Sequence, residues 1–245
     1  MIGSFLRQVA RAAGYSLRAE YPALLASPQS RLGLEPAWLL AALAARPNPV
    51  TFIQVGANDG ERADPIRAHI LDRHWRGLLF EPDIHHFEKL RENYRGETQL
   101  RLINAAVGNG AEMDLYYFDP AAPNAPDWVA GLGSFDRRTV LSHCREVPSL
   151  EPYLRQRKVS TVTVDRMFQM LGEPTVDLLL TDVEGYDADI IQQIDFRRWM
   201  PGCIFYESKH LSRSRHDELL GYLIASGYLV APGGSDSVAI RPNLF

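Results

Sequence analysis

The chain has 245 residues, of which 46% are hydrophobic and 23% are charged, and its formal net charge is −4 at pH 7. This is the composition of an ordinary globular protein, and the length suits one large α/β domain better than two. The acidic balance excludes the broad basic surface typical of nucleic-acid-binding proteins, so we expect no nucleic-acid partner. Because Cys144 and Cys203 are far apart, we expect a reducing, cytoplasmic environment without disulfides.

Residues 1–49 are predicted to form an N-terminal helical extension. Apolar residues recur at helical spacing over residues 2–13, while Arg7 and Arg11 interrupt the apolar stretch that a signal peptide needs. Such a basic amphipathic helix can make a peripheral membrane contact, but packing on the domain or in a homo-oligomer is the favoured interpretation. A second helix is predicted over residues 36–45, and no apolar run reaches the length of a membrane span.

Strands and helices alternate from residue 50 onward, which predicts one α/β domain over residues 50–245 with a mostly parallel sheet and helices on both faces. We predict strands over residues 51–55, 77–81, 101–107, 112–118, 159–164, 176–181, 203–207, 228–231 and 237–241, and helices over 65–72, 86–94, 165–171 and 214–226. Asp165 is expected to cap the third of these helices. Residues 119–150 contain four prolines and are predicted to be an irregular lid or substrate segment.

The first strand runs directly into the turn Gly56-Ala57-Asn58-Asp59-Gly60. About 25 residues later the second strand ends in Glu81, a spacing typical of nucleotide-binding α/β units. Glycine lets the backbone approach a ligand closely, and a carboxylate at the next strand end can accept the hydroxyls of a ribose. An aspartate in the turn would repel a diphosphate, whereas it suits the sulfonium and ammonium of S-adenosylmethionine. The residues therefore favour that cofactor over a nicotinamide dinucleotide, which is the alternative.

Polar side chains follow the ends of the predicted strands, where ligands bind in open α/β sheets. They are Asn58 and Asp59, Glu81, Asn104, Asp182 with Glu184, and Glu207 with His210. We expect Asp182 to contact the cofactor near its reactive methyl group, with Glu207 beside it in a catalytic role. His210 is the expected general base on an acceptor hydroxyl. Glu184 is expected either to contact the substrate or to cap the next helix.

Other candidate sites are weaker. Ser134 is the expected acceptor contact within the segment over residues 119–150. His143 lies in the same segment without neighbours at metal-ligand spacing, and a cation held by Asp182, Glu207 and His210 is not favoured, so we assign no metal site. The chain has neither a phosphate-binding P-loop motif nor a nucleophile-elbow motif, which excludes kinase and esterase hypotheses.

Five short motifs occur in order along the chain. They are Val55-Gly56-Ala57-Asn58-Asp59-Gly60, Phe80-Glu81-Pro82, Asn104-Ala105-Ala106-Val107-Gly108, Val164-Asp165 and Asp182-Val183-Glu184-Gly185. Over residues 50–241 the chain resembles the FkbM-type methyltransferases, although Thr181 stands where that family usually has a lysine.

The resemblance implies a Rossmann-like class I methyltransferase fold, with a seven-stranded sheet whose last strand is antiparallel, and S-adenosylmethionine as the methyl donor. It implies that the methionine part of the donor is held by Gly56, Asn58, Asp59 and Gly60, the ribose by Glu81, and the adenine by Asn104 and Ala105. Members of the family typically methylate hydroxyl groups of sugars or polyketide-like natural products. We therefore expect an O-methyltransferase with a small hydroxylated acceptor; a non-catalytic domain of the same fold is the alternative.

Overall fold

The structure is a computed structural model that describes residues 36–173, 175–242 and 244. The helix predicted over residues 2–13 lies outside the described residues, as do most of the extension and the membrane or subunit contacts expected of it. In the described part, no helix has the length and apolar character needed to cross a membrane.

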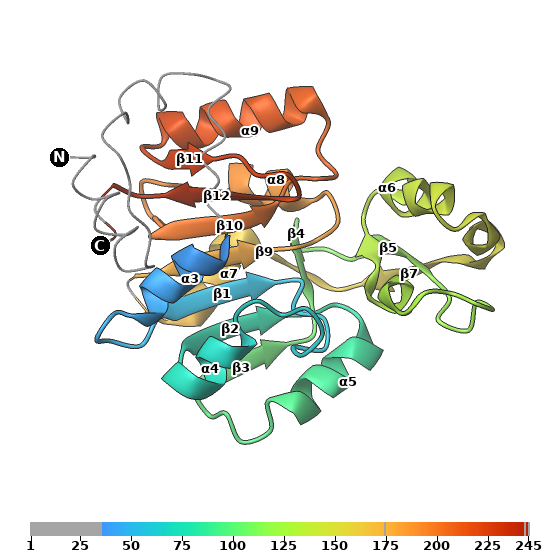
Figure 1. Cartoon of the computed structure of the whole chain (residues 1–245), viewed down its shortest axis with the longest axis horizontal. Helices are drawn as coiled ribbons and strands as arrows, with labels where there is room; N and C mark the ends of the chain where they lie inside the picture. Colours follow the sequence, from blue (N-terminus) through green and yellow to red (C-terminus); the bar gives the residue numbers. More distant parts are fainter. Residues whose placement is uncertain (1–35, 174, 243, 245) are drawn as a thin grey trace.

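A seven-stranded sheet forms the centre of the molecule, in the order β11-β12-β10-β9-β1-β2-β3 (Figure 1). Its strands are β1 (Thr51–Val55), β2 (Arg76–Phe80), β3 (Leu100–Ile103), β9 (Leu178–Thr181), β10 (Cys203–Glu207), β11 (Leu229–Ala231) and β12 (Asp236–Ile240). The five from β3 to β10 pair in parallel, whereas β12 is antiparallel to both β10 and β11. The predicted mostly parallel sheet with an antiparallel last strand is therefore confirmed.

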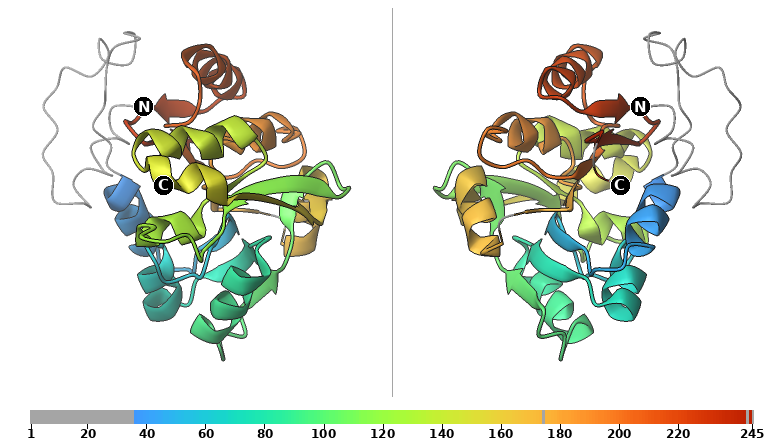
Figure 2. Two further views of the ribbon diagram at one scale, coloured as in Figure 1. Left: turned by 90° about the vertical axis from the view of Figure 1, so that its right-hand side faces the viewer. Right: turned by 90° about the vertical axis from the view of Figure 1, so that its left-hand side faces the viewer.

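Helices cover both faces of this sheet (Figure 2). One face packs against α3 (Pro36–Ala44), α4 (Arg67–Arg73) and α5 (Ile84–Asn93), and the other against α7 (Val164–Leu171), α8 (Asp187–Gln192) and α9 (Arg213–Ala225). Neighbouring residues of β1 alternate between the two layers: Phe52 belongs to the first and Ile53 to the second. Burial on both faces explains why the strands read as continuous apolar runs.

The strand predicted over residues 101–107 is two strands, because the chain leaves the sheet at Asn104. The Asn104 amide donates to the carbonyl oxygen of Glu81 at 2.9 Å, at the end of the neighbouring strand. The next strand, β4 (Ala106–Gly108), pairs instead with β8 (Thr161–Thr163) in a separate two-stranded parallel sheet.

The predicted cap of α7 is also wrong. Its N-cap is Thr163, whose hydroxyl oxygen accepts from the backbone N–H of Arg166 at 3.2 Å. The Asp165 carboxylate instead accepts from Arg198 and from the indole of Trp199, each at 2.7 Å. Two donors from a distant segment thus hold the side chain that was expected to cap the helix.

Residues 113–159 form a small lobe beside the main domain, at the C-terminal ends of the parallel strands (Figure 1). Its elements are β5 (Met113–Phe118), η1 (Asp127–Gly131), β6 (Gly133–Ser134), α6 (Arg137–Ser142), η2 (His143–Arg145), η3 (Pro148–Tyr153) and β7 (Leu154–Val159). The segment over residues 119–150 is therefore structured rather than irregular. It has an apolar core of its own, made by Phe118, Ala122, Val129, Leu132, Val140 and Leu150. Two of its prolines, Pro126 and Pro148, stand at the starts of short helices.

Candidate functional site

A cavity of about 840 Å³ lies between the C-terminal edge of the main sheet and the small lobe. Ligands bind at this edge of open α/β sheets, and the volume is near the upper end of the range for small-molecule pockets. The sheet side of the wall includes Gly56, Asn58, Glu81, Val107, Asp182 and Glu184, and the lobe side includes Tyr117, Trp128, Ser134, Phe135, Arg155 and Arg157.

Gly56 begins the turn after β1 in a conformation that favours glycine, with φ at +83°. A Cβ added there would lie 2.0 Å from the carbonyl oxygen of Asp182, so the two strand ends approach each other only because the side chain is absent. Asn58 follows with φ at +50°. Both residues line the cavity.

Asp59 and Gly60 lie outside the cavity wall and support the turn instead. The Asp59 carboxylate accepts from the backbone N–H groups of Glu61 and Arg62, at 3.0 and 2.8 Å. A Cβ on Gly60 would meet Tyr94 at 2.4 Å, so this glycine allows α5 to pack against the turn. The structure thus brings two of the four predicted turn residues to the cavity.

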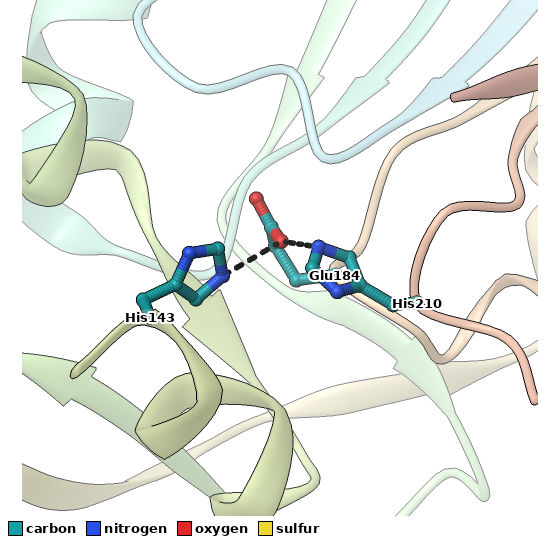
Figure 3. A group of neighbouring side chains, drawn as sticks. All are labelled: His143, Glu184 and His210. Carbon is teal, nitrogen blue, oxygen red and sulfur yellow. Dashed lines mark ion pairs between the residues drawn. The ribbon is translucent and has the colours of Figure 1, made fainter. Parts of the chain in front are cut away.

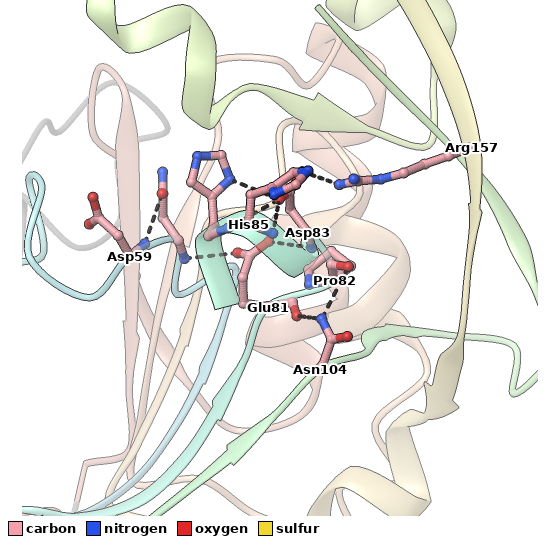
Figure 4. Close-up of polar contacts among 9 residues, drawn as sticks. Asp59, Glu81, Pro82, Asp83, His85, Asn104 and Arg157 are labelled. Carbon is pink, nitrogen blue, oxygen red and sulfur yellow. Dashed lines mark hydrogen bonds and ion pairs between the residues drawn. The ribbon is translucent and has the colours of Figure 1, made fainter. Parts of the chain in front are cut away.

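Glu81 lies at the end of β2 and lines the cavity with a carboxylate that is buried from bulk solvent (Figure 4). One oxygen accepts from the backbone N–H of Asn58 at 2.9 Å and the other from that of Asp83 at 2.7 Å. Burial raises the pKa of Glu81 to about 7 against the effect of these two bonds. Each oxygen retains a second lone pair that can accept a ligand hydroxyl.

Asn104 and Ala105, predicted beside the adenine, are absent from the cavity wall, while the next two residues, Ala106 and Val107, line it. The reason is the amide of Asn104, which is turned toward the carbonyl oxygens of Glu81 and Pro82. Asn104 therefore holds the end of β3 against the end of β2.

Arg157 is a cavity residue that the sequence analysis missed. Its guanidinium pairs with the carboxylate of Asp83, which also caps α5 (Figure 4). The same guanidinium lies 4.7 Å from the ring centroid of Tyr117. Arg155 and Arg157 both line the cavity from alternate positions of β7. That period of two is the signal that could have placed them on one face of a strand.

Asp182 follows β9, and its side chain is open to the cavity. Asp182 is exposed at the surface of the cavity, but the surrounding walls partly desolvate it, and this desolvation, together with the charges of Glu207 and Glu184, raises the pKa of Asp182 to about 8. Of the three residues predicted to be catalytic, Asp182 is the one that lines the cavity.

Glu207 and His210 do not line the cavity; His210 contacts Glu184, which does, and Glu207 lies beside them. His210 Nε2 lies 2.7 Å from Glu184 Oε2, and His143 Nε2 lies 3.8 Å from the same oxygen on the other side (Figure 3). Glu207 is buried, with its Oε1 2.5 Å from Lys209 Nζ. His210 is therefore not at the cavity, where the expected general base would act.

Glu184 does not cap the next helix, because α8 begins after Tyr186. Its backbone has φ at +52°, which directs the carboxylate toward the two histidines. Burial alone would raise the pKa of Glu184, but the adjacent imidazoles of His143 and His210 and the nearby charge of Lys209 lower it to about 2.

Ser134 lines the cavity, but its hydroxyl already has protein partners. It donates to the carbonyl oxygen of Glu184 at 2.7 Å and accepts from the backbone N–H of Asp136 at 3.1 Å. Ser134, predicted to contact the acceptor, thus connects the lobe to the loop after β9.

A search of family models matches the Methyltransferase FkbM domain over residues 54–230. The chain belongs to the FkbM methyltransferase family. Its methyl donor is S-adenosylmethionine, and the nicotinamide alternative is set aside. The family match and the strand order together place the sheet in the class I methyltransferase fold.

Three solved structures are similar to this FkbM methyltransferase at low identity. Precorrin-6y C5,15-methyltransferase from Geobacter metallireducens has 13% identity and a TM-score of 0.44, over 92% of this chain and 93% of that one. Methyltransferase FkbM from Methylobacillus flagellatus has 10% identity and a TM-score of 0.45, over 78% and 43%. The fibrillarin pre-rRNA processing protein of Methanococcus jannaschii has 12% identity and a TM-score of 0.41, over 80% and 67%. A comparison with curated protein sequences found no match.

Proposed function

We propose that this FkbM methyltransferase is an O-methyltransferase that transfers a methyl group to a hydroxyl of a sugar or a related natural product. The observation that carries the proposal is the cavity between sheet and lobe. It joins Gly56 and Glu81, which fit the methyl donor, to the carboxylate of Asp182 and to the side chains of the lobe.

The cavity residues on the β1 and β2 side fit S-adenosylmethionine. We assign the ribose hydroxyls to Glu81, whose buried carboxylate keeps free lone pairs. The methionine part is assigned to Gly56 and Asn58, where the missing Cβ leaves backbone accessible. Asp59, Gly60, Asn104 and Ala105 act indirectly, by holding the turn and strand ends in place. When bound, the donor supplies an electrophilic methyl group on its sulfonium.

The lobe side of the cavity is suited to a ring-shaped acceptor with polar groups. Tyr117, Trp128 and Phe135 provide aromatic surface, while Arg155 and Arg157 provide hydrogen-bond donors. Pockets that bind small molecules combine apolar and aromatic lining with a few convergent polar groups, and this wall has both. This combination supports a sugar or natural-product acceptor over a nucleic acid, for which the chain also lacks net positive charge.

The chemistry assigned to this chain is the placement and deprotonation of the acceptor hydroxyl. Holding the hydroxyl oxygen in line with the methyl group supplies much of the rate. As the oxygen–carbon bond forms and the carbon–sulfur bond breaks, the hydroxyl proton must leave, and Asp182 is the cavity carboxylate at the strand end where it can be received. We assign this role to Asp182 instead of His210, the base expected from sequence, because the ring of His210 faces Glu184.

The test is transfer of a labelled methyl group to a panel of hydroxylated sugars and natural products, with the product identified by mass spectrometry. Asp182→Asn keeps the size of the side chain and removes the group that can accept a proton, so turnover at saturating donor and about pH 8 should fall at least about tenfold, within the range of general-base contributions. Asp189→Asn on α8, whose partner is Arg215 on the surface, is the control and should retain wild-type turnover. Wild-type turnover by Asp182→Asn contradicts the assignment, and donor binding without transfer to any acceptor favours the non-catalytic alternative.

A further inference from the structure

Three side chains from distant parts of the chain meet at one point beside the cavity, whose wall includes Glu184. His143 comes from η2 of the small lobe, Glu184 from the loop after β9, and His210 from the segment after β10 (Figure 3). One donor atom from each lies within 4.8 Å of those of the other two. A second group shares Glu184 and adds the carboxylates of Asp182 and Glu207 at the same spacing.

The atoms that meet there have no hydrogen-bond partner among the described residues. They are His143 Nε2, His210 Nε2, Glu184 Oε2 and Glu207 Oε2, all buried from solvent. His210 Nε2 and Glu184 Oε2 are 2.7 Å apart but do not form a hydrogen bond of acceptable geometry. Leaving a buried polar atom without a partner costs about 1–3 kcal/mol, so four together at one point call for an occupant.

Glu207 supports this independently of the histidines. Only 4% of its surface is exposed, and its Oε1 is taken by Lys209 at 2.5 Å. Its Oε2 has no partner within the described chain and lies 3.8 Å from His210 Nε2. A buried carboxylate oxygen thus faces the same space as the imidazole nitrogens, although Lys209 already neutralises part of its charge.

We propose that His143, Glu184 and His210 bind a divalent transition-metal ion of the Zn²⁺ type, with Glu207 beside it as a further oxygen donor. Imidazole nitrogen with carboxylate oxygen is a ligand set that suits Zn²⁺ and its first-row neighbours, whereas Mg²⁺ and Ca²⁺ prefer oxygen alone. Ligand atoms about 2.0–2.2 Å from a tetrahedral ion are separated by roughly 3.3–3.6 Å. The separations of 2.7 and 3.8 Å observed here bracket that value.

An ion pair without a metal explains the cluster less well. Protonated histidines would satisfy Glu184 only if their N–H bonds pointed at its carboxylate, which the geometry does not provide. The carboxylates of Glu184 and Glu207 outnumber the single lysine, Lys209, that pairs with both. A cation is therefore favoured by the charges as well as by the direction of the donor atoms.

The site would fasten the small lobe to the main sheet, because His143 belongs to the lobe and the other ligands follow β9 and β10. Trp128, which lines the cavity, packs against His143 with ring centroids 5.4 Å apart. An ion at this point would thus fix the cavity wall on the lobe side. The inference does not rest on the proposed acceptor or on methyl transfer, and binding of the metal alone tests it.

The full-length protein is stripped with EDTA, dialysed, and titrated with Zn²⁺ by calorimetry and with Co²⁺ by visible absorption. We expect one equivalent to bind at about micromolar Kd or tighter, with Co²⁺ bands of a site below six-coordinate. His143→Ala, His210→Ala and Glu184→Gln should each weaken binding at least about a hundredfold, while His216→Ala on α9 should not change it. Circular dichroism of each variant checks that the fold is retained.

Two results overturn the proposal. One is a wild-type protein that binds less than half an equivalent of either ion at 100 µM. The other is a folded His143→Ala or His210→Ala variant that binds as tightly as wild type, which would show that the ion sits elsewhere. If the variants do not fold, the wild-type stoichiometry and the Co²⁺ spectrum decide alone. These readouts are independent of methyl transfer, so failure of the proposed activity leaves them interpretable.

Discussion

Among single residues, Glu81 has the environment that most directly links structure to cofactor binding. Its carboxylate is buried beside the cavity, and the pKa of Glu81 is raised to about 7 by that burial. Below that pH the side chain is mostly a neutral acid, and above it a charged acceptor for ribose hydroxyls. Hydrogen bonds to a charged group are worth about 1.5–3 kcal/mol, against roughly 1 kcal/mol for neutral pairs.

We therefore expect S-adenosylhomocysteine to bind more tightly at pH 8 than at pH 6, as measured by calorimetry. Glu81→Gln, which cannot ionise, should weaken binding roughly ten- to a hundredfold at pH 8 and reduce its pH dependence between pH 6 and pH 8. A variant that keeps both the wild-type affinity and the wild-type pH dependence would remove Glu81 from the ribose site.

Gly56 and Gly221 have different surroundings, so we expect replacement by alanine to have opposite effects on stability at the two positions. Gly56 has φ at +83°, and a Cβ there would lie 2.0 Å from a backbone oxygen. Gly221 lies inside α9, with nothing within 4 Å of the added atom. Gly56→Ala should therefore lower the free energy of unfolding by at least about 2 kcal/mol, and Gly221→Ala should raise it by about 0.5–1 kcal/mol.

Denaturant unfolding of the two variants beside wild type measures both changes. Because the strain at Gly56 acts where the ends of β1 and β9 meet, Gly56→Ala should also lose measurable donor binding. Equal effects of the two substitutions would mean that the turn after β1 relaxes around a side chain.

At the scale of elements, the joint between the lobe and the sheet shapes the cavity. Ser134 of β6 donates to the carbonyl oxygen of Glu184, and the ring of Phe135 packs edge-on against that of Tyr186 with centroids 5.0 Å apart. Arg157 of β7 pairs with Asp83 at the start of α5. These contacts connect the main domain to a lobe that has its own apolar core.

Ser134→Ala should loosen this joint, because it removes a donor from the partly buried carbonyl oxygen of Glu184 and an acceptor from the N–H of Asp136. We expect the free energy of unfolding to fall by about 1–3 kcal/mol and limited proteolysis within residues 119–150 to become faster. Adding donor and acceptor together should slow that cleavage. Ser142→Ala, which loses a bond only within the lobe, is the matched control for joint opening. Cleavage at the same rate in every variant and ligand state would argue against a lobe that opens.

At the scale of the whole molecule, stability depends on a carboxyl group that folding removes from water. Asp187 begins α8 with no exposed surface, and burial raises its pKa to about 7. The folded state thus holds this proton at pH values where the unfolded chain has released it. The contribution of Asp187 to the free energy of unfolding is therefore fully present below about pH 4 and is lost as the pH rises toward 7. The total loss is on the order of 4 kcal/mol.

Asp187→Asn should make the free energy of unfolding less dependent on pH, so that the variant loses less stability than wild type between pH 5 and pH 8. Denaturant unfolding at several pH values measures the slope, which does not depend on the packing cost of the substitution itself. A variant with the wild-type slope would show that Asp187 is ionised in the folded protein at neutral pH.

The order of strands and helices, the glycine turn and the acid after β2 were predictable from the sequence. Each is encoded by neighbouring residues: apolar runs for strands buried on both faces, and glycine where the turn needs a positive φ. The motifs from Val55 to Gly185 also carried the resemblance to the family that the match over residues 54–230 confirms.

The tertiary structure alone decided which polar side chains face the cavity and which face each other. Asp59 and Asn104 stand in the right motifs but bond to nearby backbone, and His210 meets Glu184 and His143 rather than the cavity. The lobe could not be predicted from the sequence, because the apolar residues of its core follow no regular helical or strand spacing along the chain. Local pattern fixes the direction of the backbone, whereas the partner of a side chain depends on residues that only the folded chain brings within reach.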